Sequence, residues 1–393
     1  MKDRQFYDFY NWLFFCAFLP FIGYMFLFFP STILGFNLTG WAWLIMLLVT
    51  GYYFLQRYAA VTFPIGFWIP WLAYLWLYLL YRFSFPGLQL TLQYLVPLLV
   101  GVIASSFVYD REKLHWLYKR MLLLSFVVVL LFAYGRLFRG GWTPFAAATP
   151  MLLSVAAALS IGLFYMTRKV RFIGFFFLFF LVPFIDVTRM GILVFLLIFI
   201  FHFANRKVFS KIAFSAVGLL LVLLVFNSKG FQEKTFYEGR GEISDLSVNY
   251  YEPGSMMNTS GRANFLQFYE RGLKTSPLFG NGPRADMYVL KSIWGGAGIS
   301  EAHNDYLSVR YNYGYVGLAL LLFGFVTTFL ALNARFWKEK APYRILLQST
   351  TMILTLTFLI YMYSDNILKS TVFFTHFYFA LLGVVYARFS DQA

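Results

Sequence analysis

Side chains able to take part in chemistry are concentrated in two places of this chain. One is the segment 228–310, which holds His303, its only histidine, and several arginines, Arg262 among them. The other is the turn around Arg189, between two apolar runs. An imidazole exchanges protons near neutral pH, and a guanidinium donates paired hydrogen bonds to phosphate or carboxylate oxygens. Proton transfer and anion binding are therefore the chemistry to expect in these two places.

The residue pattern around these side chains predicts how they are positioned. Residues 261–274 are expected to form a helix capped by Thr259 or Ser260, because apolar side chains recur there at helical spacing. They are Phe265, Phe268, Tyr269, Gly272 and Leu273. A turn cluster follows over 276–284. If residues 302–310 form the first part of the next membrane helix, His303 and Arg310 lie seven residues apart on one face, and His303 stands at the mouth of the bundle.

The composition shows that these elements belong to a membrane protein. Of 393 residues, 60% are hydrophobic and only 12% charged, against roughly 25% charged in soluble proteins. This excludes a soluble enzyme, a disordered chain and an outer-membrane barrel. Recurring apolar runs of about 20 residues predict an all-α integral membrane protein. About twelve transmembrane helices are expected, at roughly 10–29, 38–56, 64–81, 88–108, 117–137, 143–166, 170–186, 189–205, 208–227, 311–333, 343–363 and 370–389.

Lysine and arginine are distributed unevenly between alternate loops. One side carries 18 of them, and the short loops of the other side carry five. The positive-inside rule places the first side in the cytoplasm, together with both termini, and residues 228–310 outside. That long segment holds nine basic and nine acidic residues, so the net charge of +15 comes mostly from topology signals. No nucleic-acid partner is needed to explain the charge.

We therefore predict a single membrane domain in three parts. Residues 1–227 form a nine-span bundle, 228–310 an external catalytic loop that carries short helices, and 311–393 a three-span C-terminal part. The outer loop 364–369 brings Asp365 and Lys369 to the external side as well. Nothing in the sequence separates a role for these two residues at the site from a solvated loop. The chain has no Asp-x-Asp, which disfavours a nucleotide-sugar enzyme that holds a metal through that motif.

Three blocks, in this order, resemble the O-antigen ligase and polymerase family of membrane glycosyltransferases. The first is Thr188-Arg189-Met190-Gly191, similar to the family's Ser/Thr-Arg-x-Gly element, although Met190 departs from the small residue usual after this arginine. The second is Ser260-Gly261-Arg262, followed by the amphipathic helix and Pro277-Leu278-Phe279-Gly280-Asn281-Gly282. The third is His303-Asn304-Asp305-Tyr306-Leu307 and then Tyr313-Gly314-Tyr315-Val316-Gly317-Leu318. Together the blocks cover about residues 186–320.

The resemblance implies a GT-C-like enzyme of the bacterial inner membrane. It would move a glycan from an undecaprenyl-diphosphate carrier to a sugar hydroxyl at the outer face, inverting the anomeric centre without a metal or other cofactor. His303 would be the general base that takes the hydroxyl proton. Arg189 and Arg262 would stabilise the charge that grows on the diphosphate leaving group. The expected substrate-binding residues are Arg284, Arg310, Asn304 and Tyr306.

Two acceptors remain open at this point. A second lipid-linked repeat unit would make the protein a polymerase of O-antigen, capsule or exopolysaccharide, which prior frequency alone favours, with a chain-length regulator as a candidate partner. Lipid A-core as acceptor would make it a ligase. The alternative from another class is a transporter, which predicts mid-span ionisable residues and internal symmetry; few such residues and no evident repeat are visible. Arginines at span ends also serve as interface anchors, so each assigned role is a hypothesis.

Overall fold

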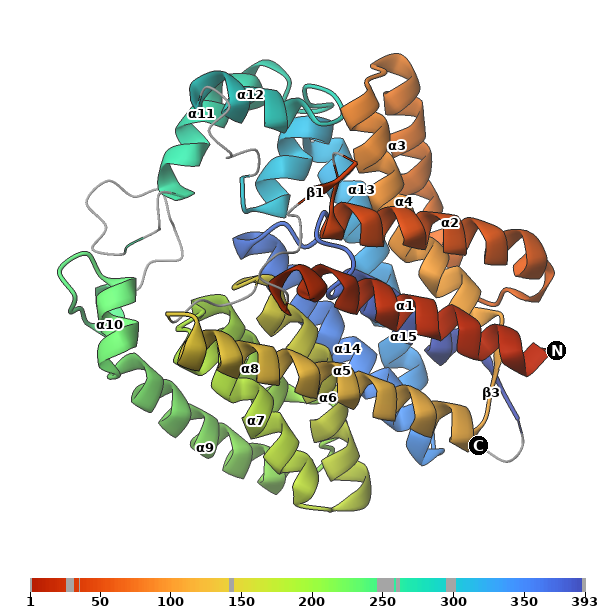
Figure 1. Ribbon diagram of the computed structural model, residues 1–393, viewed down its shortest axis with the longest axis vertical. Coiled ribbons are helices and arrows are strands. Elements are labelled where there is room, and N and C mark those ends of the chain that lie inside the picture. The colour runs from red at the N-terminus through yellow and green to blue at the C-terminus, as the bar shows by residue number, and fades with distance from the viewer. Residues whose placement is uncertain are drawn as a thin grey trace.

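The computed structural model describes residues 2–25, 32–34, 36–140, 145–245, 258, 262–294 and 302–390. Within these residues the fold is all-α, and strands are limited to two short pairs. β1 (Thr32–Ile33) pairs antiparallel with β2 (Phe36–Asn37), and β3 (Val108–Tyr109) pairs parallel with β4 (Arg388–Phe389). The second pair joins the start of α5 to the C-terminal end of the chain. Figure 1 shows it on the side of the bundle away from α10 and α11.

Each of the twelve expected spans coincides with a helix in the described part of the chain. They are α1 (Lys2–Met25), α2 (Leu38–Arg57), α3 (Ile69–Tyr81), α4 (Phe85–Ser105), α5 (Arg111–Phe138), α6 (Ala148–Thr167), α7 (Arg171–Ile185), α8 (Arg189–Phe201), α9 (Val208–Phe226), α13 (Asp305–Phe336), α14 (Pro342–Ser364) and α15 (Thr375–Tyr386). Short 3-10 turns η1 (Tyr58–Ala60) and η2 (Ile65–Phe67) link α2 to α3.

Seven of these helices, counted within the described residues, are long and apolar enough to cross a membrane. They are α2 with η1, α4, α5, α6, α9, α13 and α14. Four others, α3, α7, α8 and α15, are apolar but have only 12 to 15 residues, short of the roughly 20 residues that span a bilayer. The all-α class agrees with the sequence prediction of a membrane protein, and the count of twelve spans stays a prediction.

Burial separates the centre of the bundle from its edge. In α6, 83% of the apolar window is buried inside the protein, whereas in α9 only 11% is buried. Helix α6 packs against α7, α8 and α14, and α9 lies at the outer edge in Figure 1. The side chains of α9 are as apolar as those of α6, so in a membrane they face lipid at no cost.

Side-chain caps fix where several helices begin. Asn37, Ser84, Asp110 and Asn304 precede α2, α4, α5 and α13, and each side chain accepts a hydrogen bond from a backbone N–H of the first turn. Such caps satisfy donors that have no partner inside the helix. The cap at Asn304 matters for the site, because it sets the residue at which α13 starts.

The segment between α9 and α13 carries short helices, as the sequence predicts. They are α10 (Lys229–Thr235), η3 (Ile243–Asp245), α11 (Arg262–Thr275) and α12 (Ala285–Trp294). Helix α11 confirms the helix expected over 261–274. Tyr269 and Leu273 of its apolar face are buried in a small second core with Leu290 and Tyr311. The expected caps Thr259 and Ser260 lie outside the described residues.

Candidate functional site

The imidazole of His303 lies against the carboxylate of Asp365. The His303 Nδ1 and Asp365 Oδ1 atoms are 3.3 Å apart, although 62 residues separate them in the sequence. The His303 side chain is 47% exposed and that of Asp365 is 14% exposed. In the tautomer with its proton on Nδ1, the imidazole donates that proton to the carboxylate, and the Nε2 lone pair is available to a substrate. An exposed histidine oriented by a less exposed carboxylate has the geometry of a general base.

The expected helical position of His303 was wrong. Helix α13 begins at Asp305, Asn304 is its N-cap, and His303 stands before it with a φ of 49°. The left-handed backbone turns the histidine away from the helical path, so helix spacing does not place it on one face with Arg310. The start of α13 is set instead by its N-cap, because the Asn304 Oδ1 accepts a hydrogen bond from the Leu307 N–H at 2.9 Å.

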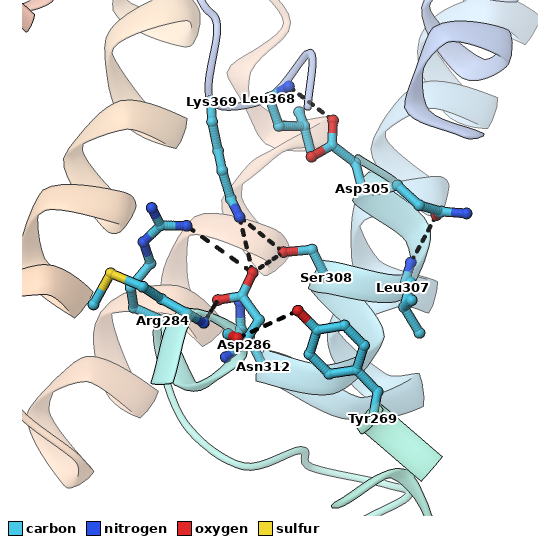
Figure 2. A network of polar contacts seen from close by, with 11 residues as sticks. Tyr269, Arg284, Asp286, Asp305, Leu307, Ser308, Asn312, Leu368 and Lys369 are labelled. Atoms are coloured by element: carbon cyan, nitrogen blue, oxygen red, sulfur yellow. Dashed lines mark hydrogen bonds and ion pairs between the residues drawn. The ribbon is translucent and has the colours of Figure 1, made fainter. Parts of the chain in front are cut away.

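The loop 365–369 is anchored to the start of α13 rather than solvated. The Leu368 N–H donates to Asp305 Oδ2 at 2.9 Å. The Lys369 ammonium donates to Asp286 Oδ2 at 2.8 Å and to the Ser308 hydroxyl at 3.0 Å. Figure 2 shows Lys369 and Leu368 reaching down from this loop onto α12 and α13. The same loop carries Asp365, so these contacts hold the carboxylate beside His303.

Asp286 is the buried centre of this network. Its carboxylate has no solvent exposure, and it also accepts from the Ser308 hydroxyl and lies 4.0 Å from Arg284. Burial alone would raise the pKa of Asp286, but the charges of Lys369 and Arg284 and the hydrogen bonds outweigh it and lower that pKa. Asp286 therefore stays ionised and keeps two cations in place (Figure 2).

Two motif glycines lock α12 to α13. Gly314 interrupts α13 with a φ of 69°, and the loop before α12 fills the break. The N–H groups of Asn281 and Gly282 donate to the carbonyls of Tyr311 and Asn312, at 2.9 and 3.0 Å. A Cβ on Gly280, whose φ is 79°, would lie 2.5 Å from the Gly314 nitrogen. Only glycine allows this approach, which gives the second and third sequence blocks a shared structural reason.

Three cations lie near Asp186, in the turn between α7 and α8. Arg136 of α5 forms an ion pair with Asp186, and the Lys234 ammonium of α10 donates to the Asp186 carbonyl at 2.9 Å. Arg189 donates from Nη1 to the Asn258 carbonyl at 2.7 Å. Burial, together with the charges of Arg189 and Arg136, lowers the pKa of Lys234, and Asp186 opposes this only in part. Among the described residues, three cations therefore lie close enough to influence one another at this turn.

The remaining expected site residues, Arg284, Tyr306, Arg310 and Arg262, lie in three different surroundings. Arg284 joins the Asp286 network. Tyr306 donates its hydroxyl to the Leu359 carbonyl at 2.9 Å, and the Arg310 guanidinium lies 4.4 Å from the centre of the Tyr315 ring. The first contact joins α13 to α14, and the second lies within α13, across the break at Gly314. Arg262 is the first residue of α11, and its side chain lies outside the described part of the chain.

Sequence reasoning missed Asp286, Arg136 and Lys234 as parts of these clusters. Asp286 follows the Gly-Pro-Arg turn and lies in the first turn of a short helix, where solvated carboxylates are common, so the sequence gave no local sign that it is buried. Arg136 and Lys234 are single charges near a helix end and in a charged segment, where solvated residues are common. Only docking of α10 and α12 against distant helices brings these charges together.

Comparison with known proteins gives a family for the middle of the chain. A family model described as O-Antigen ligase matches residues 174–322. The match includes Arg189, Arg262 and His303, whereas Asp365, Lys369 and Arg136 lie outside it. No curated protein matches the chain. With the three motif blocks and both polar clusters in view, the match over residues 174–322 supports the O-antigen ligase and polymerase family for this part of the chain.

Proposed function

We propose that this protein transfers a glycan from an undecaprenyl-diphosphate carrier to a sugar hydroxyl at the outer face of the bacterial inner membrane. The acceptor hydroxyl we favour belongs to a second lipid-linked repeat unit, so the reaction extends a polysaccharide. The observation that carries the proposal is the exposed His303 imidazole held by Asp365 at 3.3 Å. His303 supplies a base within the residues that match the family model, in the polar segment 228–310 that we expect to face outward.

The base step follows from the geometry of this pair. The acceptor oxygen attacks the anomeric carbon of the donor from the face opposite the diphosphate, and its proton passes to His303 Nε2. Asp365 keeps the proton of Nδ1 in place and stabilises the imidazolium that forms. The new glycosidic bond forms as the bond from the anomeric carbon to the diphosphate oxygen breaks, with its electron pair remaining on the diphosphate.

The leaving diphosphate needs permanent positive charge. Arg136, Arg189 and Lys234 place three cations close to one another beside Asp186. Guanidinium and ammonium groups bind phosphate oxygens through charge-assisted hydrogen bonds, so this grouping suits a diphosphate. Arg262 is the further cation that the sequence pattern proposes for this role. Because the three cations come from α5, α8 and α10, they form a preformed anion site rather than a flexible one.

A ligase is the second candidate, and one observation favours it. The description of the matching family model is O-Antigen ligase, and a ligase passes the finished glycan to lipid A-core instead of a repeat unit. Donor, base and anion site are the same in both reactions, and only the acceptor differs. A chain-length regulator protein is a partner proposed for the polymerase alone.

A transfer assay with the purified full chain tests the proposal. Lipid-linked repeat unit is supplied alone or with lipid A-core, in the presence of a chelator, to wild type, His303→Ala and the matched surface control Lys211→Gln. A ladder of longer lipid-linked glycans from the repeat unit alone supports the polymerase. Product only in the presence of lipid A-core supports the ligase. The control should behave as wild type, and His303→Ala should lose about 10²-fold or more in rate.

Two outcomes would overturn the proposal. Transfer at the wild-type rate by His303→Ala would remove the base from the mechanism. No transfer by folded protein with authentic substrates would overturn glycan transfer itself and return the transporter to first place.

A further inference from the structure

A large cavity lies among the helices, away from both polar clusters. Its volume is about 1050 Å³, and α1, α5, α6, α7, α14 and α15 contribute its walls. Inside the bundle the walls are apolar, with Leu117, Met121, Leu159 and Phe377 among them. Helix α5 lines it only as far as Leu122. Arg136 of the cation cluster lies 14 residues further along α5, about 21 Å at 1.5 Å per residue, so the cavity is a separate site.

The mouth of this cavity is basic. Arg111 at the start of α5, and Lys169 and Arg171 at the start of α7, line it and are exposed. The Arg111 Nε donates to the Tyr343 hydroxyl at 2.9 Å, which orients this guanidinium. Two carboxylates also line the mouth. Asp110 caps α5 and lies 3.5 Å from the Lys113 ammonium, and the other is Glu112. Positive charge therefore remains in excess.

We propose that this cavity binds an anionic membrane phospholipid, with an acyl chain among the apolar walls and the phosphate at Arg111, Lys169 and Arg171. An apolar space of about 1050 Å³ is slightly larger than the roughly 300–1,000 Å³ typical of ligand pockets, and an apolar cavity is filled by apolar groups rather than water. Guanidinium and ammonium groups at the rim then select a lipid with a net negative headgroup over a zwitterionic one. The mouth also lies on the side that the basic loops mark as cytoplasmic, where anionic lipids attract such groups.

Native mass spectrometry of the full chain in detergent tests this site. The delipidated protein is titrated with phosphatidylglycerol, with phosphatidylcholine of the same chains, and with inorganic phosphate. We expect phosphatidylglycerol to bind at least tenfold more tightly than phosphatidylcholine, and phosphate alone not to bind measurably. The variant Arg111→Gln/Lys169→Gln/Arg171→Gln should lose this preference. The variant Leu159→Trp, which fills the cavity and leaves the rim intact, should weaken binding of both lipids.

The matched control removes three basic residues from the same end of the bundle but outside the cavity: Lys207→Gln/Lys211→Gln/Lys338→Gln. It should keep the wild-type preference. Equal binding of the two phospholipids by the wild type, or an equal loss in the control, would overturn the proposal in favour of ordinary surface lipid. Phosphate binding as tight as phospholipid binding would overturn it in favour of a plain anion site. Glycan transfer is not measured, so this test is independent of the proposed function.

Discussion

The ion pair between Asp286 and Lys369 gives the sharpest test of how the site is held together. Its side chains are 0% and 7% exposed, and the ammonium lies 2.8 Å from the carboxylate. Replacing Asp286 by Asn removes the carboxylate from beside the Lys369 ammonium, which is 7% exposed, and from near the Arg284 guanidinium, which is 15% exposed. Breaking a buried pair in this way costs roughly 3–5 kcal/mol. We expect Asp286→Asn to lower the free energy of unfolding by about that amount.

The chain offers a matched control for this substitution. Glu270 and Lys274 on α11 form a shorter pair, 2.6 Å, but are 57% and 74% exposed. Exposed helical pairs are worth about 0.3–0.5 kcal/mol, so Glu270→Gln should cost about that much. The measurement is reversible unfolding of both variants in mixed micelles. Removing the orphaned charge as well, with Asp286→Asn/Lys369→Met, should recover part of the loss.

The pKa of Asp286 also predicts how the stability of the protein changes with pH. The folded-state pKa of Asp286 is lowered from its ordinary value of 3.8, so its contribution to stability is fully present above that value and is lost as the pH falls through the folded pKa. Asp286→Asn should lack this loss. If the Asp286 variant costs no more than Glu270→Gln, or if its unfolding keeps the same acid dependence as the wild type, the buried network does not support the loop, and our reasoning about Asp365 is refuted with it.

Three further predictions follow from the same geometry. Gly280→Ala should lower the free energy of unfolding by about 2 kcal/mol or more, because the new Cβ meets the Gly314 backbone and the φ of residue 280 is positive. The control is Gly174→Ala, whose Cβ meets nothing within 4 Å. It should be neutral or stabilising in the same unfolding assay. Asp365→Asn should lower kcat of glycan transfer about 10- to 100-fold with little change in KM, because the base loses its orienting carboxylate; an unchanged kcat would contradict the pairing. Donor affinity should fall as pH rises through the lowered pKa of Lys234, because a neutral amine no longer attracts a diphosphate. In KM measurements from pH 7 to 10, Lys234→Arg should abolish this dependence, and a dependence unaltered by that change would exclude the residue.

The sequence by itself determined the class and the elements of this protein. Each of the twelve apolar runs overlaps a helix of the described structure, because helix formation in such runs depends on local composition. The amphipathic period of residues 261–274 predicted α11 and its buried face, including Tyr269 and Leu273. The motif blocks around Arg189, Arg262 and His303 indicated the family, which the match over residues 174–322 supports.

Only the tertiary structure decided which charges meet. His303 pairs with Asp365 across 62 residues, Asp286 with Lys369 across 83, and Arg136 with Asp186 across 50. The spacing of residues in the sequence does not predict such pairs, because they depend on how separate loops and helices dock. A charged residue in a loop also has the same neighbours in the sequence whether it is solvated or buried. The left-handed backbone at His303 is likewise a feature of the tertiary structure. The helix expected to include His303 begins only at Asp305, because Asn304 caps it. The position of the imidazole is then set by its contact with Asp365.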